Sequence, residues 1–395
     1  MNEKPAKNQD NGEVISSSIR SLKDLLDQIT GRDLGDISSE GDSGLAELWP
    51  FPFLALVGQK EMKLGLLLSL VNPAIGGVLL VGPRGTGKTT AVRGLIDLLP
   101  TVSASNCYYG CLEEDIEIGG MDAVCPDCAE KFGKGEALSA LRNVKLIELP
   151  LNADLDDVVG SIDERAQVQN RMRIRRGILS QADKNILFID EVNLLNDQVV
   201  DVILDAAAQG SYTVKRGPVA ATYRSRFILI GTMNPEEGGL RPQIMDRFGL
   251  RLAVHGLDRA EDRLEAYTRS QAYIKYPKKV VDLWVSETIL AQNEVESARE
   301  ILEDVVLPKA IALIGIEMIK SFGIVSLRAE LTLLESAKAY AAINNRLEVT
   351  KEDIFTIAPM ILRLRRSEFI KKYIETQGEE ENEINNIIKK FSSGK

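Results

Sequence analysis

The sequence predicts an α/β fold, with helices on both faces of a parallel sheet and an all-α domain after it. Short apolar runs typical of buried strands alternate with helical segments between about residues 50 and 257. A glycine-rich loop joins the first of these runs to a helix. After Asp258 the strand signals stop, and helical periodicity continues, most clearly from Ser326 to Asn344.

The composition counts against several classes of protein. With 395 residues, the chain is long enough for two or three domains. Its net charge of −10 disfavours nucleic acid as the main partner, because an acidic surface repels a phosphate backbone. No apolar stretch approaches the ~20 residues that span a membrane, and the polar N-terminus lacks the apolar core of a signal peptide. We therefore expect a cytoplasmic protein, or one of the plastid stroma in a phototrophic eukaryote.

The strongest local signal is a phosphate-binding loop. The apolar run Val78–Val81 is followed by GPRGTGKT (82–89) and by a helix predicted over Lys88–Leu99. Glycines let backbone N–H groups approach phosphate oxygens, and the helix N-terminus adds a favourable dipole. Lys88 places its charge on the β- and γ-phosphates, while the Thr89 hydroxyl is available to Mg²⁺. The expected nucleotide contacts are Gly82, Pro83, Arg84, Gly85, Thr86, Gly87, Lys88, Thr89 and Thr90.

Two later apolar runs complete the predicted nucleotide site. Ile186–Ile189 ends at Asp190 and Glu191, and ligands bind where the strands of such sheets end. Asp190 is predicted to hold Mg²⁺, and Glu191 to polarise the attacking water. The run Phe227–Ile230 leads to Asn234, which is placed to orient that water.

The spacing of these motifs requires additional structure. Lys88 and Asp190 are separated by about a hundred residues. One helix, the strand predicted at Val144–Leu149 and a second helix need far fewer, because connections in α/β units are mostly short. We therefore expect insertions between the two motifs.

Two arginines are candidates for reading the nucleotide. Arg247 lies in LRPQIMDRFG (240–249), and Arg328 begins a predicted helix of the C-terminal domain. Each has an ordinary interpretation as a solvated or salt-bridged side chain. The functional interpretation of Arg247 is an arginine finger that reaches the γ-phosphate of a neighbouring subunit. Arg328 would sense the nucleotide from the second domain.

Together with their flanking residues, these motifs resemble magnesium chelatase subunit I, an AAA+ ATPase. The resemblance runs from about Pro52 to Lys372. Its most specific part is GTMNPEEG (231–238) followed by LRPQIMDRFG (240–249). VGQKEMKL (57–64), GPRGTGKTTAVRGL (82–95) and IDEVNLL (189–195) add to it.

The resemblance implies a P-loop AAA+ domain with an all-α lid, binding ATP and Mg²⁺ between subunits of a homo-oligomeric ring, expected to be a hexamer. It implies Asn234 as sensor 1, Arg247 as the finger and Arg328 as sensor 2. A hairpin near Gly210–Arg224 and an insertion near Gly160–Arg176 also follow. The implied partners are a D-type AAA+ protein with an integrin-like metal-binding domain and an H-type protein that binds the porphyrin. Together they insert Mg²⁺ into protoporphyrin IX in chlorophyll and bacteriochlorophyll biosynthesis.

Four clustered cysteines depart from the plant-like members of this family. Cys107, Cys111, Cys125 and Cys128 form two close pairs separated by a loop, a pattern that suits tetrahedral Zn²⁺. An iron–sulfur cluster and four reduced thiols remain alternatives. The single histidine, His255, excludes a metal site built from several histidines.

Other departures keep different functions open. The basic segment at Arg363 to Arg366 follows Leu362, where the family usually has a histidine. One alternative is a related AAA+ motor that acts with an integrin-like metal-binding partner in protein remodelling or other metal loading. A second is a nucleotide-switch scaffold that barely hydrolyses ATP, although intact Glu191 and Arg247 argue against it. A helicase is the least favoured alternative because the chain is acidic and has no added DNA-binding module.

The expected organisation follows from these motifs. We expect a disordered polar N-terminal arm at 1–47, an AAA+ ATPase core at 48–257 with a Cys-rich insertion at 103–135, a helical domain at 258–372 and a polar acidic tail at 373–395.

Overall fold

The computed structural model describes residues 49–99, 101–162, 174–217 and 219–365. The predicted N-terminal arm and acidic tail lie outside these residues, as does the middle of the insertion predicted at Gly160–Arg176. Within the described part of the chain, no helix is both long and apolar enough to cross a bilayer.

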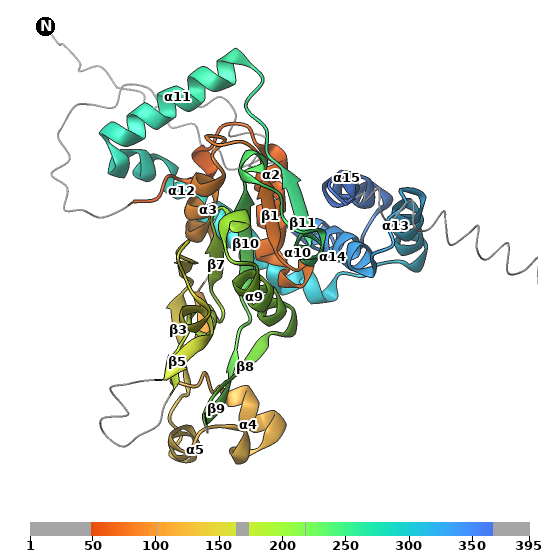
Figure 1. Cartoon of the computed structure of the whole chain (residues 1–395). Coiled ribbons are helices and arrows are strands. Elements are labelled where there is room, and N and C mark those ends of the chain that lie inside the picture. The colour runs from red at the N-terminus through yellow and green to blue at the C-terminus, as the bar shows by residue number, and fades with distance from the viewer. Residues whose placement is uncertain (1–48, 100, 163–173, 218, 366–395) are drawn as a thin grey trace, which may run out of the picture.

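Among the described residues, five parallel strands form the central sheet, in the order β11-β1-β10-β7-β4 (Figure 1). Their bounds are β1 Val78–Val81, β4 Leu146–Glu148, β7 Ile186–Ile189, β10 Ile228–Met233 and β11 Leu250–Ala253. The first four correspond to the four strands predicted from the sequence. The edge strand β11 was not predicted, because the charged Arg251 interrupts its short apolar run; the fold nevertheless buries that side chain.

Alternate residues of each inner strand enter two separate cores. In β1, Val78 and Leu80 belong to a first hydrophobic cluster, and Leu79 and Val81 belong to a second one. The same alternation occurs in β7 and β10, as expected where both faces of a parallel sheet are covered. The predicted fold class, a parallel sheet with helices on both faces and an all-α region after it, is confirmed.

Helices of the first part of the chain cover both faces. Those of the first cluster are α2 Lys60–Val71 and α3 Lys88–Gly94, and those of the second are α6 Leu155–Val159, α8 Ile178–Gln181, α9 Asp197–Gln209 and α10 Pro242–Arg247. The helix predicted over Lys88–Leu99 is shorter than expected, because its last part is the 3₁₀ helix Leu95–Leu98.

In the same described ranges, three antiparallel ribbons project from this core. They are β2 Thr101–Ser105 with β3 Ser139–Asn143, β5 Gly160–Ile162 with β6 Ile174–Arg176, and β8 Ser211–Arg216 with β9 Val219–Arg224. The first two lie between Lys88 and Asp190, where the spacing of the motifs predicted additional structure. The third is the hairpin expected near Gly210–Arg224. Helices α4 Glu113–Gly119 and α5 Pro126–Gly133 lie between β2 and β3.

The C-terminal region is helical and packs on the first cluster. Its helices are α11 Ala260–Lys275, α12 Pro277–Ile301, α13 Lys309–Ser321, α14 Leu327–Ile343 and α15 Lys351–Leu362. The fully buried Trp284 of α12 and Leu333 of α14 belong to the same cluster as Leu80 of the sheet. The helical region is therefore joined to the sheet through a continuous apolar core.

Candidate nucleotide-binding site

The order of three neighbouring strands brings the predicted motifs together. β10 lies between β1 and β7, so the residues that follow these three strands meet at one edge of the sheet. Leu80 of β1 is paired with Thr232 of β10, and Gly231 of β10 with Ile189 of β7. This register places Thr232 between the phosphate loop and Asp190.

The loop from Gly82 to Gly87 has the backbone that a phosphate-binding turn requires. Gly85 and Gly87 have φ angles of 77° and 84°, a conformation that favours glycine. A Cβ at Gly82 would lie 2.1 Å from the carbonyl oxygen of Val254, so this position has no room for a side chain. Helix α3 begins at Lys88, directly after the loop. Its N-terminal amides therefore face the space that the loop encloses.

Lys88 is buried at the base of this loop, with 8% of its surface exposed. Its Nζ donates to the carbonyl oxygens of Gly82 and Pro83, at 2.7 and 2.8 Å. Burial lowers the pKa of Lys88, while the charges of Asp190 and Glu191 oppose that shift. A buried ammonium with carbonyl acceptors is suited to an incoming phosphate, which would supply the opposite charge.

Asp190 is the centre of a hydrogen-bonded line across the strand ends. The Thr89 hydroxyl donates to its two carboxylate oxygens, at 3.2 and 3.1 Å. The Thr232 hydroxyl donates to Asp190 Oδ1 and accepts from the backbone N–H of Glu191, at 2.9 Å. Thr232 was missed from the sequence, although it stands in the GTMN motif. The pairing of β10 with β7 is what brings the Thr232 hydroxyl within hydrogen-bond distance of both Asp190 and the N–H of Glu191.

Glu191 has an unusual backbone, with φ of 51°. A non-glycine residue in this left-handed region costs on the order of 1–3 kcal/mol and is frequent at functional sites. Its Oε1 lies 3.5 Å from Nη2 of Arg84, which also pairs with Glu237. Glu237 is a second contact that sequence reasoning did not identify.

Asn234 follows β10 and is almost fully buried. Its side-chain oxygen accepts from the backbone N–H of Glu236 at 3.2 Å, which fixes the turn after the strand. Asn234 lines the same cavity as Asp190 and Glu191. Within the described chain, this cavity of about 220 Å³ is lined by Arg84, Gly85, Thr86, Gly87, Lys88, Thr89, Thr90, Asp190, Glu191, Thr232 and Asn234.

A second cavity adjoins the first and is less polar in its lining. Its volume is about 570 Å³, and Leu56, Val57 and Leu257 lie in its wall. The two cavities share the loop residues Arg84, Gly85, Thr86 and Gly87, together with Thr90 of α3. A polar cavity and a larger, partly apolar one that share a glycine-rich loop suit the two ends of a nucleoside triphosphate.

The structure does not bring the two predicted arginines into this cavity. Arg247 lies at the end of α10, where Nη1 donates to Asp205 at 2.6 Å and to the carbonyl oxygen of Asp201 at 3.2 Å. Arg328, at the start of α14, donates to the carbonyl oxygen of Asp246 at 2.9 Å. Neither side chain lines the pocket of its own chain.

Asp246 joins the helical region to α10 and was not identified from the sequence. Its carboxylate lies 3.0 Å from Arg251 Nη2, 3.4 Å from Arg365 Nη1 and 3.7 Å from Arg328 Nη1. Arg365, which follows α15, also donates to the carbonyl oxygen of Gly249, so this part of the helical region is held beside β11. Asp246 directly precedes Arg247 in α10, so these contacts lie next to that arginine.

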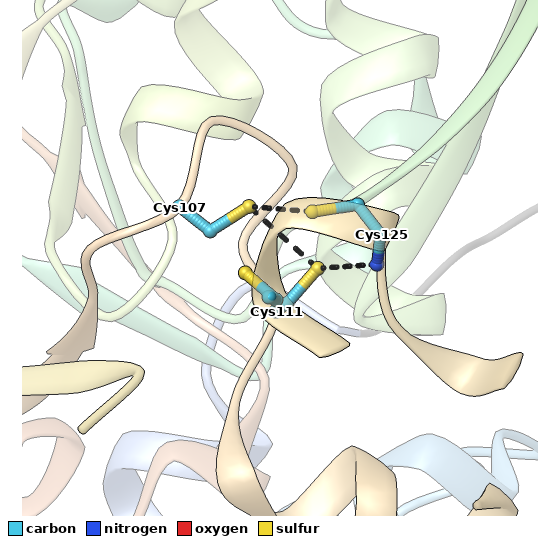
Figure 2. A group of neighbouring side chains, drawn as sticks. Cys107, Cys111 and Cys125 are labelled. Atoms are coloured by element: carbon cyan, nitrogen blue, oxygen red, sulfur yellow. Dashed lines mark hydrogen bonds between the residues drawn. The ribbon is translucent and has the colours of Figure 1, made fainter. Parts of the chain in front are cut away.

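The four predicted cysteines lie together outside the nucleotide cavity. All four are free thiols, and their Sγ atoms lie within 4.8 Å of one another. Figure 2 shows Cys107, Cys111 and Cys125 with their sulfur atoms pointing toward one another.

Comparison with known proteins gives the same architecture. Residues 77–248 match the AAA domain family (dynein-related subfamily), and residues 317–387 match the AAA lid domain family. A magnesium-chelatase subunit ChlI homolog from Methanocaldococcus jannaschii is 41% identical over 323 residues, covering 81% of this chain and 87% of that protein. The chloroplastic magnesium-chelatase subunit ChlI of Glycine max is 40% identical over 318 residues, covering 80% of this chain and 74% of that protein. A putative ATPase of known structure from Cytophaga hutchinsonii shares the fold, with a TM-score of 0.50, 21% identity and coverage of 79% of this chain and 83% of that one.

Proposed function

This chain belongs to the magnesium-chelatase subunit I family of AAA ATPases, and we propose that it powers insertion of Mg²⁺ into protoporphyrin IX. Family membership supports the choice of reaction. The observation that supports hydrolysis is the line of hydrogen bonds from Thr89 through Asp190 and Thr232 to Glu191. This line supports the proposal because the Asp190 carboxylate, which would bind Mg²⁺, and the Glu191 carboxylate both lie beside the phosphate loop.

The residues at the strand ends fit ATP with Mg²⁺. Lys88 and the amides at the start of α3 would hold the β- and γ-phosphates. The Thr89 hydroxyl and the Asp190 carboxylate, already hydrogen-bonded to each other, offer the oxygen ligands that Mg²⁺ prefers. When bound, the ion would neutralise charge that develops on the phosphates.

Each of the other side chains at the site would have one role in ATP hydrolysis. Glu191 would take a proton from a water molecule while the oxygen of that water forms a bond to the γ-phosphorus. The bond from that phosphorus to the bridging oxygen breaks, and ADP leaves with the electron pair. Asn234 would orient the water, and Lys88 would stabilise the negative charge on the transferred group.

The position of Arg247 supports catalysis between subunits. Arg247 is held against α9 outside the cavity of its own chain, so we assign it to the active site of a neighbour in a homo-oligomeric ring. Mixing two inactive variants tests this directly. Arg247→Ala retains Glu191, and Glu191→Gln retains the finger, so mixed rings should regain ATPase activity. A mixture as inactive as either variant alone would place the finger elsewhere.

The proposed assembly includes two further proteins. They are a D-type partner with an integrin-like metal-binding domain and an H-type partner that binds the porphyrin, meeting this chain in the cytoplasm or plastid stroma. Arg328 would report the nucleotide state to the lid as sensor 2. The proposed cofactors are ATP with Mg²⁺ and, at the four cysteines, one structural Zn²⁺.

The experiment that tests the function is fluorimetric. This protein is mixed with its D-type and H-type partners, ATP, Mg²⁺ and protoporphyrin IX, and Glu191→Gln serves as the matched control. ATP-dependent Mg-protoporphyrin from the unaltered protein alone supports both the reaction and the named base. ATPase activity without product, using both partners from the same species, would overturn the chelatase assignment and favour a related motor with another partner.

A further inference from the structure

The segment between β2 and β3 has too small an apolar core to explain its order. In it, Cys111, Cys128 and Leu138 form the buried cluster, with Ile116 and Val124 packed beside them. Helices α4 and α5 each have fewer than nine residues, and isolated helices of that length are unstable in water. Small modules of this kind are usually held by disulfides or by a structural metal.

The distances between the sulfur atoms distinguish a disulfide from a metal site. The Sγ atom of Cys107 lies 3.6 Å from that of Cys111 and 3.5 Å from that of Cys125. A disulfide requires about 2.05 Å. Four sulfurs around one tetrahedral Zn²⁺, each at about 2.3 Å, lie about 3.8 Å apart. In a four-iron cluster each cysteine binds a different iron, so the sulfurs lie farther apart than they do around a single ion.

Backbone amides point at two of these sulfurs. The N–H of Tyr109 donates to Cys107 Sγ at 3.2 Å, and the N–H of Cys125 donates to Cys111 Sγ at 3.4 Å. Such bonds stabilise the negative charge of a thiolate, the form that binds metal. Both donors lie in the backbone segments that carry the cysteines, so the fold of these segments also positions the sulfur ligands.

Residues between the cysteines contact both other ribbons. Tyr108 donates to the carbonyl oxygen of Ile174 at 2.7 Å and accepts from the N–H of Arg176 at 3.1 Å, both in β6. Asp115 of α4 forms an ion pair with Arg224 of β9. In Figure 1, α4, α5 and the β8–β9 hairpin gather at the end of the molecule away from α13 to α15.

We propose that Cys107, Cys111, Cys125 and Cys128 bind one Zn²⁺ and that this ion fixes the β5–β6 and β8–β9 ribbons in one orientation. Tyr108 lies within the first cysteine pair, and Asp115 lies within the loop that joins the two pairs. Ordering of this segment by the metal therefore also orders the groups that hold β6 and β9. The ion has four protein ligands and no open position, so its role is structural.

Metal content is the first test, and it needs neither nucleotide nor partner proteins. Full-length protein should contain about one zinc per chain by plasma mass spectrometry, and Co²⁺ exchanged into the site should give the strong absorption of a tetrahedral thiolate complex. Cys125→Ser should lose most of the zinc. Asp127→Asn, an exposed neighbour in the same CPDC sequence, should retain it. Metal-free protein with four freely titrating thiols, or iron in place of zinc, would overturn the assignment.

Hydrogen exchange tests the role of the ion and does not depend on a Cys variant that folds. Removal of zinc from the unaltered protein by a chelator should raise exchange in β6 and β9, while β1 and β10 stay protected. Restored protection after added Zn²⁺ alone would confirm a reversible effect. Unchanged hydrogen exchange in both ribbons after complete zinc loss would show that the ion does not fix their orientation, and would overturn this part of the proposal. Because no ATP is present, these outcomes stand apart from the chelatase test.

Discussion

Replacing Thr232 with valine tests how the site holds Glu191. The Thr232 hydroxyl donates to Asp190 and accepts from the N–H of Glu191 at 2.9 Å. Valine has nearly the same shape, and Thr232 is 1% exposed within β10, so the substitution changes polarity and leaves the side-chain volume nearly unchanged. The substitution therefore removes both hydrogen bonds of this hydroxyl without opening a cavity.

The expected loss of ATPase activity follows from the negative charge of Asp190, which strengthens its hydrogen bond with Thr232. A hydrogen bond to a charged group contributes about 1.5–3 kcal/mol, and an N–H left without an acceptor adds a penalty of similar size. Glu191 already has an unfavourable φ of 51°, and the bond from its N–H helps to hold it there. If about 1.5–3 kcal/mol of this energy, roughly half of the total, is lost from the transition state, kcat falls by about 10- to 150-fold.

Steady-state ATP hydrolysis by Thr232→Val measures this loss, with Thr232→Ser as the matched control. Serine keeps the hydroxyl and loses only a methyl group, so its kcat should stay close to that of the unaltered protein. KM should change little in the valine variant, because Lys88 and the loop that binds the phosphates are unchanged. Melting temperatures of all three proteins check that the sheet is intact.

Two outcomes would contradict this explanation. Unchanged kcat in a folded Thr232→Val protein would show that Glu191 keeps its position without the hydroxyl. Equal losses in the serine and valine variants would show that the methyl group, and hence packing, is what matters.

Three further perturbations follow from the structure. Arg247→Ala should assemble but lose ~10³ or more in ATP turnover, the scale of a missing arginine finger; near-normal turnover would contradict its role. Asp246→Ala removes the carboxylate shared by three arginines and should destabilise the lid by about 1–3 kcal/mol, measured as increased exchange in α14; unchanged protection there would contradict the link. Burial lowers the pKa of Lys63 from its ordinary 10.5 to about 7, so the unfolded chain binds more protons between these values and stability should rise with pH across that window. Lys63→Met should reduce this rise in melting temperature, whereas the exposed Lys278→Met should not.

The local parts of the site could be predicted because neighbouring residues determine them. GPRGTGKT (82–89) specifies a turn that only glycines allow, followed at once by a helix. Ile186–Ile189 is apolar throughout because both of its faces are buried, and Asp190 then stands at the strand end. In each case the chemistry and its placement lie within a few residues of sequence.

Contacts between distant segments could not be predicted in this way. Thr232 resembles any other residue of a buried strand until β10 is found between β1 and β7. Arg251 resembles a polar interruption until Asp246 and the carbonyl oxygen of Leu364 are found beside it. Tertiary packing supplies the Leu364 carbonyl from the far end of the helical region, and the turn after α10 brings Asp246 beside Arg251.

Patterns along the chain were enough to establish the alternating strands and helices, the phosphate loop, the carboxylates at the strand end and the two pairs of cysteines. The folded chain was needed to show that Thr232 joins Asp190 to Glu191, that Arg247 lies outside its own cavity, and that four thiols lie within 4.8 Å. The two groups of features differ in the range of the interactions that create them. Backbone conformation and burial pattern depend on adjacent residues, whereas strand order and register depend on the whole core.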